Sequence, residues 1–149
     1  LAIAVIHDAI GERPIYFAAS GGMMSQLGLE PWGVRPGLAV KLEFRSLEGP
    51  QPPELVKGSA QYGGEYFHLE RSLKLYQHVY GFRGIRDRPI WQDRATLNIP
   101  WHFYALALQL SDAARVAGVD PQVVKLLEDD ARSFQLVAEG GARGTPPDS

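Results

Sequence analysis

NIPWHFYALALQLSDAARVAGVDPQVVKLLEDDARSF, at residues 98–134, predicts two consecutive helices with a short turn between them. Asn98 can cap the first helix, and Gly118 ends it because glycine readily adopts the left-handed conformation. Asp120, followed directly by a proline, is a strong start signal for the second helix. Because the connection is short, we expect an antiparallel αα-hairpin that is similar to one tetratricopeptide unit.

Each predicted helix carries an apolar stripe that should face the interior. The expected core positions are Trp101, Tyr104, Ala105, Leu108 and Ala114 on the first helix and Val123, Val124, Leu127, Ala131 and Phe134 on the second. If Trp101 lies in the core, Trp101→Ala should cost roughly 3–5 kcal/mol of stability.

Ahead of the hairpin, the hydrophobic pattern predicts a small sheet with helices beside it. The expected elements are a helix at 2–11, a buried strand at 13–19, a short helix or loop at 23–34, a half-exposed strand at 38–45 and a helix at 65–80. The strand at 38–45 is the clearest of these, since apolar residues alternate with charged residues there.

The fold class that follows is α+β: a small β-sheet with flanking helices, then a C-terminal αα-hairpin. The expected organisation is a small α/β part at 1–45, a Pro/Gly-rich linker or surface loop at 46–64, a helical part at 65–138 and a disordered tail at 139–149. The last two assignments follow from helical periodicity and from a Gly- and Pro-rich composition, respectively.

Composition limits the classes of function. The 149 residues are enough for one ordinary domain, and a net charge of −2 gives no electrostatic reason to bind nucleic acid. The absence of cysteine excludes disulfides and thiolate zinc sites. None of the four histidines has a compact ligand spacing, so the sequence predicts no metal and no cofactor.

Two loop regions contain candidate ligand-binding residues. The turn Ser20-Gly21-Gly22 follows a predicted strand, and its backbone N–H groups could cradle an anion, although the same residues serve any tight turn. Two loop aromatics, Trp32 and Tyr62, are candidates for stacking on a sugar.

The third candidate region is an Arg-rich loop. Arg86 and Arg88 could grip a phosphate, and Trp91 could stack on a sugar. In the alternative interpretation, the arginines pair with Asp87 and Asp93 while Trp91 covers the core. No residue in the chain carries a catalytic signature that we would assign.

Several phrases occur in an order that is characteristic of one family. They are Arg13-Pro-Ile-Tyr-Phe-Ala18, Gly28-Leu-Glu-Pro-Trp32, Pro36-Gly-Leu-Ala-Val-Lys-Leu42, Phe82-Arg-Gly84 and Tyr104-Ala-Leu-Ala-Leu-Gln-Leu110. Over about residues 1–120 the chain resembles the C-terminal part of bacterial membrane proteins of the domain of unknown function 2723 family, which are similar to protein O-mannosyltransferases. Trp32 departs from this pattern where the family has Tyr, and Arg35-Pro36 depart where it often has an acidic residue.

The resemblance implies a larger enzyme whose membrane part transfers sugar from a lipid-phosphate donor. The catalytic carboxylates of such enzymes lie in the membrane part, so no catalytic residue is assigned here. The resemblance also implies a periplasmic domain that braces the membrane-embedded part of the same parent chain or holds an acceptor polypeptide or glycan. The chain starts at Leu1 within an apolar segment too short to span a bilayer, and we expect it to be part of a longer protein. The alternative is a free-standing sugar- or peptide-binding module without catalysis.

Overall fold

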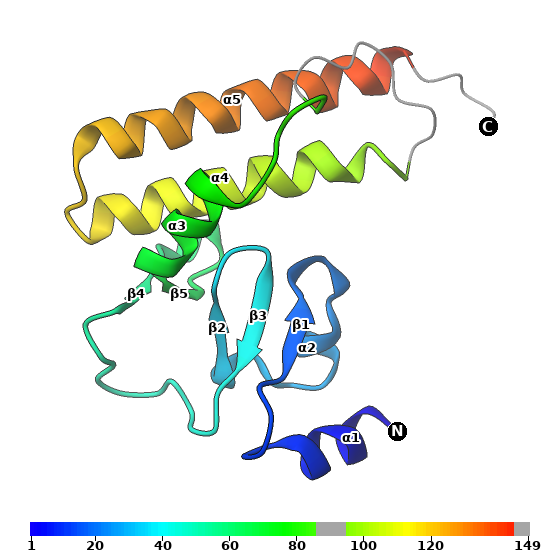
Figure 1. The fold of residues 1–149 in the computed structure, drawn as a ribbon, viewed down its shortest axis with the longest axis vertical. Helices are drawn as coiled ribbons and strands as arrows, with labels where there is room; N and C mark the ends of the chain where they lie inside the picture. Colours follow the sequence, from blue (N-terminus) through cyan, green and yellow to red (C-terminus); the bar gives the residue numbers. More distant parts are fainter. Residues whose placement is uncertain (86–94, 145–149) are drawn as a thin grey trace. The chain divides into compact units, whose positions relative to one another are not determined.

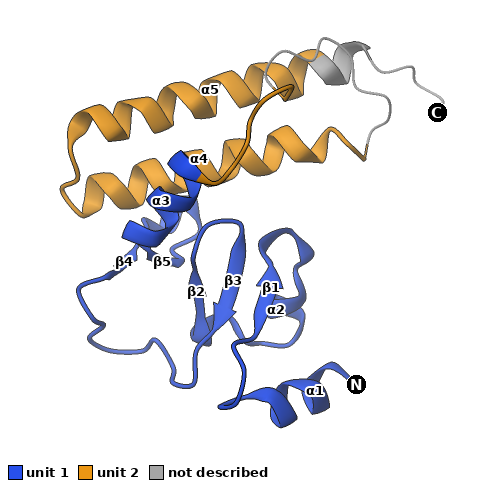
Figure 2. Ribbon diagram, viewed as in Figure 1, with its two compact units in different colours: residues 1–78 blue, residues 79–149 orange. Residues whose placement is uncertain are grey.

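A five-stranded sheet and a pair of long helices dominate the structure, a computed structural model that describes residues 1–85 and 95–144 (Figure 1). The chain divides into two compact units, residues 1–78 and residues 79–149, which are coloured separately in Figure 2. The first unit contains the sheet, and the second contains the helix pair. The predicted α+β class, with a small sheet and a C-terminal helical hairpin, is therefore confirmed.

The sheet of the first unit has the strand order β1-β3-β2-β5-β4. The strands are β1 (Tyr16–Ala18), β2 (Gly33–Arg35), β3 (Ala39–Leu42), β4 (Leu55–Lys57) and β5 (Tyr66–His68). Neighbouring strands are antiparallel except β2 and β5, which run parallel near the middle of the sheet. The sheet thus joins one antiparallel group, β1-β3-β2, to an antiparallel pair, β5-β4.

Two predicted strands have different outcomes. The alternating strand is confirmed as β3, where Val40 and Leu42 are buried and Lys41 is half-buried. The prediction of a buried strand at 13–19 is wrong, because only residues 16–18 form β1 and this strand lies at the edge of the sheet. Phe17 packs against the core, while Tyr16 and Ala18 on the opposite face of β1 are exposed.

The sequence did not reveal β2, β4 or β5, each of which has three residues. Strands this short hardly show a period of two. β4 lies inside the segment 46–64 that reads as a linker, and β5 precedes the helix expected at 65–80. That helix is α3 (Leu69–His78), and it belongs to the first unit together with the sheet.

The core of the first unit forms around Met24, Val40 and Leu42. Met24 comes from the short helix α2 (Met23–Gln26), and partly buried side chains such as Ile6 and Phe17 pack against the cluster. Ile6 belongs to α1 (Ala2–Ala9), which confirms the expected first helix, although none of its residues is fully buried.

The second unit is the predicted helical hairpin, formed by α4 (Asn98–Val116) and α5 (Pro121–Gly144). Gly118 has a φ of 70°, as expected at the end of α4. Asp120 caps α5 by accepting a hydrogen bond of 2.8 Å from the Gln122 N–H. Asn98, by contrast, is the first helical residue rather than the cap. α5 extends to Gly144, beyond residue 139 where the tail was expected to begin.

Four of the five core positions predicted on α5 are buried, whereas on α4 only Ala114 of the five predicted positions is buried. Val124, Leu127, Ala131 and Phe134 are buried on α5. On α4 the buried apolar side chains are Leu106, Ala107, Leu110, Ala113 and Ala114, while Ala105 and Trp101 are exposed. Apolar residues occupy almost every position from 103 to 108, so periodicity could not select one face. The aromatic contacts of Phe103 with Phe134 and Phe82 mark the face that is used.

Trp101→Ala should therefore have a small effect. The residue is 38% exposed, and its indole makes an edge-on contact with Tyr104 at 5.5 Å between ring centroids. We expect a loss of about 1 kcal/mol, the size of one aromatic pair, measured by urea unfolding. If Trp101→Ala instead lowers the free energy of unfolding by about 3–5 kcal/mol, Trp101 lies in the core as the sequence predicted.

In the described part of the chain, no helix combines the length and the apolar character needed to cross a membrane.

Candidate functional site

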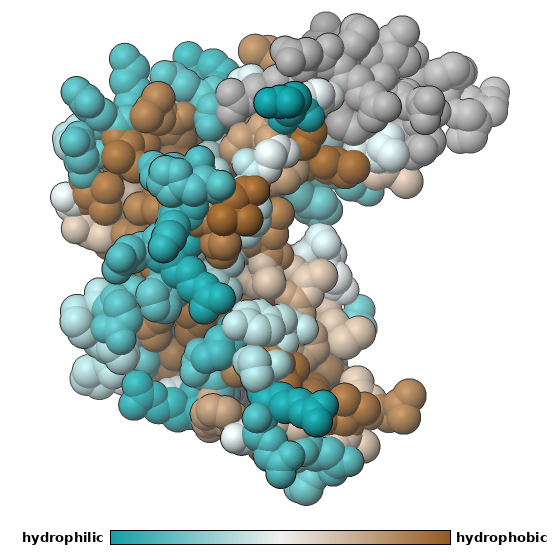
Figure 3. Space-filling model, in the orientation of Figure 1, coloured by the Kyte–Doolittle hydropathy of each residue, from teal (hydrophilic) through white to brown (hydrophobic). Residues whose placement is uncertain are grey.

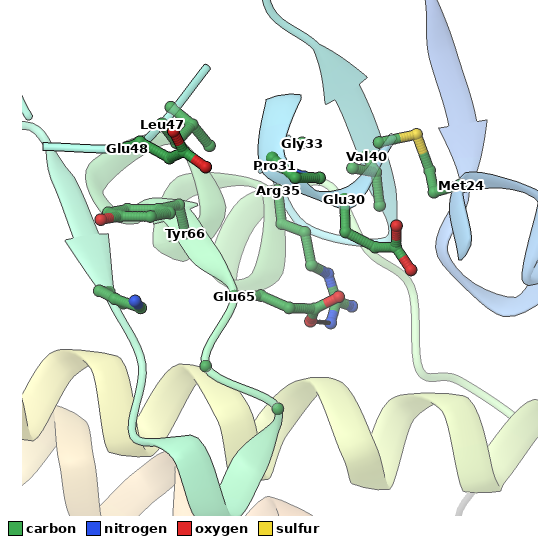
Figure 4. A pocket seen from close by; sticks show the side chains of 13 residues that line it. Met24, Glu30, Pro31, Gly33, Arg35, Val40, Leu47, Glu48, Glu65 and Tyr66 are labelled. Atoms are coloured by element: carbon green, nitrogen blue, oxygen red, sulfur yellow. Dashed lines mark hydrogen bonds and ion pairs between the residues drawn. The ribbon is translucent and has the colours of Figure 1, made fainter. Parts of the chain in front are cut away.

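A pocket of about 430 Å³ opens beside β2 and the start of β5 in the first unit (Figure 4). We call it the sheet pocket. Its apolar side is formed by side chains that include Met24, Val40 and Leu47. Its polar side contains the glutamates 30, 48 and 65 together with Arg35, Lys57 and Tyr66. Apolar walls with a few placed polar groups are typical of small-molecule sites.

The polar centre of the pocket is the ion pair of Arg35 and Glu65. Arg35 Nη1 lies 2.6 Å from Glu65 Oε2, and the Arg35 side chain is only 7% exposed. The guanidinium also donates through Nε to the Gly37 carbonyl and lies 5.1 Å from the centroid of the Phe67 ring. A buried charge needs a partner and further hydrogen bonds, and Arg35 has both.

α3 fixes the backbone that carries Arg35. The buried Ser72 hydroxyl donates to the Arg35 carbonyl and accepts from the Gly37 N–H, each at 3.0 Å. One side chain thereby satisfies two backbone groups in the turn between β2 and β3. The arginine enters the pocket from a backbone held at both ends of this turn.

Lys57 and Tyr66 bring an ammonium group and an aromatic ring together. They are cross-strand neighbours on β4 and β5, and Lys57 Nζ lies 5.5 Å from the Tyr66 ring centroid. Figure 4 shows Tyr66 and Glu48 at one end of the pocket, Met24 at the other, and Arg35 with Glu65 between them. The pocket therefore offers hydrogen-bond donors, carboxylate acceptors and an aromatic surface.

The carboxyl group of Glu30 stays ionised over a wider pH range than usual. A hydrogen bond from the Ser25 side chain is the main cause that lowers the pKa of Glu30, and a backbone hydrogen bond adds to it. Because the pKa is lowered in the folded chain, any stabilisation from this group is present above the unfolded pKa and is lost as the pH falls through the folded value.

Ser25→Ala should raise the pKa of Glu30 toward its ordinary value, because it removes the donor that favours the carboxylate. The side-chain carboxyl carbon of Glu30, followed by NMR as a function of pH, reports this directly. An unchanged titration in Ser25→Ala would show that the hydroxyl has no influence on the carboxylate.

Glycines shape the pocket as much as side chains do. A Cβ at Gly33 would lie 2.9 Å from Met24 Cε and 2.9 Å from Val40 Cγ1, so the close packing of the apolar side requires glycine there. Gly63 and Gly64 also line the pocket, and both have positive φ. Both glycines therefore have a backbone conformation that other residues rarely adopt.

The sequence candidates Trp32 and Tyr62 flank the sheet pocket rather than line it. Trp32 ends a 3-10 turn and packs partly buried against the Met24 cluster, while its neighbours Pro31 and Gly33 line the pocket. Tyr62 likewise ends a 3-10 turn directly before Gly63. Each of the two predicted residues is thus a chain neighbour of residues that line the pocket, but neither lines it.

The turn at residues 20–22 does not line this site. Ser20 and Gly21 belong to a 3-10 turn, Gly22 precedes α2 with a φ of 62°, and none of the three lines the pocket. Arg86, Arg88 and Trp91 lie outside the described residues. Within residues 1–85 and 95–144, no group of three His, Cys, Asp or Glu side chains is placed to hold a metal ion.

Sequence reasoning missed Arg35 as a site residue, and it gave Glu65 no role. The two residues are thirty positions apart and meet only because β2 and β5 pair in parallel, with Arg35 opposite Phe67. No local signal predicts this pairing, since both strands are short. Among the described side chains that line the pocket, none is serine, cysteine or histidine.

No family model matches the chain, and comparisons with curated proteins and with solved structures give no significant match.

Proposed function

We propose that the chain is an extracytoplasmic, non-catalytic domain of a membrane glycosyltransferase similar to protein O-mannosyltransferases. The ordered set of family-like phrases carries this proposal. Two of the phrases pair directly in the fold: the first contributes β1, the third contributes β3, and Phe17 lies opposite Val40. This pairing supports the resemblance, because the phrases belong to one structural unit.

In this proposal the domain faces the periplasm, where it braces the membrane-embedded part of its parent chain or holds the acceptor. Two features support these roles. Leu1 and the helix α1 that follows it expose the aliphatic side chains of Leu1, Ile3 and Val5, and hydrophobic atoms lie beside hydrophilic ones at this end of the first unit in Figure 3. Such surface suits contact with an apolar partner. The sheet pocket supplies polar groups that could contact an acceptor.

A second candidate function is a free-standing sugar- or peptide-binding module without catalysis. The sheet pocket favours it, since binding there requires no membrane part. The two candidates differ in whether the chain has a membrane-embedded parent.

The coding DNA upstream of Leu1 provides the first test. The proposal expects several apolar spans of about 20 residues in the same reading frame. A start codon close to Leu1 with no such spans would overturn the membrane-glycosyltransferase proposal and leave the binding module.

The non-catalytic assignment has its own test. Purified chain 1–149 is incubated with a polyprenyl-phosphate-linked mannose and a Ser/Thr-containing acceptor peptide, and peptide mass is measured. No transfer is expected, whereas transfer that depends on the purified chain would contradict the assignment.

A further inference from the structure

We infer that the sheet pocket is a binding site for one neutral hexose unit of a glycan. The inference deepens the proposed function, and it rests on that proposal for the source of the hexose, an acceptor glycan. The binding itself is argued from the pocket alone.

The size and walls of the pocket fit a ligand with both an apolar and a polar face. Its volume of about 430 Å³ lies within the usual range for small-molecule sites of roughly 300–1,000 Å³. Met24, Val40 and Leu47 form an apolar side that can contact the C–H groups of a sugar ring. The polar side chains on the other side of the pocket can form hydrogen bonds with the hydroxyl groups of the sugar.

The pocket contains both hydrogen-bond acceptors and hydrogen-bond donors for the hydroxyl groups of a sugar. The carboxylates of Glu30 and Glu48 accept, and the ammonium of Lys57 donates. Within the described residues, the Glu48 carboxylate has no ion-pair partner, so it can bond to a ligand without first breaking a salt bridge. A hydroxyl group can serve as donor to a carboxylate and as acceptor from an ammonium at once.

The pocket is lined by charges of both signs, so a charged ligand of either sign would meet at least one like charge. Three glutamates against Arg35 and Lys57 give the lining residues a formal charge of −1, and the charge of Arg35 is already compensated by Glu65 at 2.6 Å. A lysine or arginine side chain from a peptide would meet Lys57 as a like charge, and an anion would meet Glu30 and Glu48. A neutral polyol avoids both penalties.

The polar centre is held rigid before any ligand arrives. Arg35 is fixed by Glu65, by the Gly37 carbonyl and by the Phe67 ring, and Ser72 fixes its backbone. Polar groups that are already in place lose little conformational entropy when a ligand binds. Arg35 and Glu65 therefore form a fixed polar centre beside the exposed side chains of Glu30, Glu48 and Lys57.

The test is an NMR titration of the full chain 1–149, labelled with ¹⁵N, with methyl α-D-mannopyranoside as the probe. We expect saturable shifts of the amide signals of Gly33, Gly63 and Gly64, which line the pocket. Shifts that are absent from these glycines up to 100 mM probe, or that are spread over the whole chain, would overturn the inference.

A variant and a matched control make the test specific. Glu48→Gln keeps the size of the side chain but removes a charged acceptor, and we expect binding to weaken about tenfold. Glu54→Gln makes the same chemical change at an exposed glutamate that does not line the pocket, and affinity should stay as in the parent chain. Equal effects of the two variants would contradict the assigned site.

A second titration separates the ligand classes. An acetylated, amidated peptide that contains lysine is added in place of the sugar, and we expect no saturable shifts at the three glycines. Tighter binding of the peptide than of the sugar would overturn the hexose assignment. If the sugar binds but no membrane spans are encoded upstream of Leu1, the proposed function is refuted and this inference stands. If the spans are encoded but the sugar does not bind, this inference is refuted and the proposed function stands.

Discussion

Phe134→Ala should cost about 3–5 kcal/mol of stability in the second unit, the largest effect expected from a single truncation there. Phe134 is fully buried, stacks on Phe103 at 5.5 Å between ring centroids, and meets Phe82 edge-on at 5.2 Å. Replacement by alanine removes these contacts and leaves a cavity between the two helices. The measurement is hydrogen exchange of the slowest amides of α4 and α5, which reports the free energy of opening.

Leu136→Ala is the matched control for this experiment. It truncates a large apolar side chain on the same helix, two positions away, but Leu136 is 64% exposed. We expect a change within about 0.5 kcal/mol, since exposed sites contribute little to stability. Similar losses in the two variants would mean that α5 does not bury the face described here.

Ser72→Ala should destabilise the first unit by about 2–4 kcal/mol, the second large effect. The substitution removes almost no volume, but it leaves the buried Arg35 carbonyl and the Gly37 N–H without the hydroxyl that joins them. Each orphaned buried group costs about 1–3 kcal/mol. Hydrogen exchange of the amides of β2 and β3 measures the loss.

Ser111→Ala is the control for the loss of a buried hydroxyl. Ser111 is 2% exposed, but its hydroxyl bonds to the Leu108 carbonyl one helical turn away. Such local bonds to helix carbonyls add little stability, so the expected loss is below about 1 kcal/mol. If Ser111→Ala lowers the stability as much as Ser72→Ala does, the two hydrogen bonds of Ser72 to the β2–β3 turn contribute no more than a local bond within a helix.

Local signals were sufficient for the helical hairpin. Gly118 and Asp120 act on their immediate neighbours, so their effect on the backbone could be predicted without knowledge of the fold. The face of α4 could not be predicted in this way. Its apolar residues surround the helix over more than a turn, and only the contact with Phe134 on α5 selects the buried side.

Most residues of the sheet pocket could not be predicted from the sequence around them. Arg35 reads as an exposed cation in a sequence, because arginine is rarely buried without a partner. Its burial depends on Glu65 and on the hydroxyl of Ser72, and both arrive through the parallel pairing of two three-residue strands. Trp32 and Tyr62 lie next in the chain to Gly33 and Gly63, which line the pocket, but no local signal distinguishes these neighbours.

The parallel pairing of β2 with β5 also determines how the sheet can assemble. β2 with β3 and β4 with β5 are antiparallel neighbours along the chain, and such hairpins form within microseconds. Joining the two halves requires the closure of a long loop, which is entropically less favourable and therefore later. Arg35 and Glu65 lie on opposite sides of that junction. Formation of the pocket and completion of the sheet are consequently one event, and a molecule bound there would protect the junction from opening.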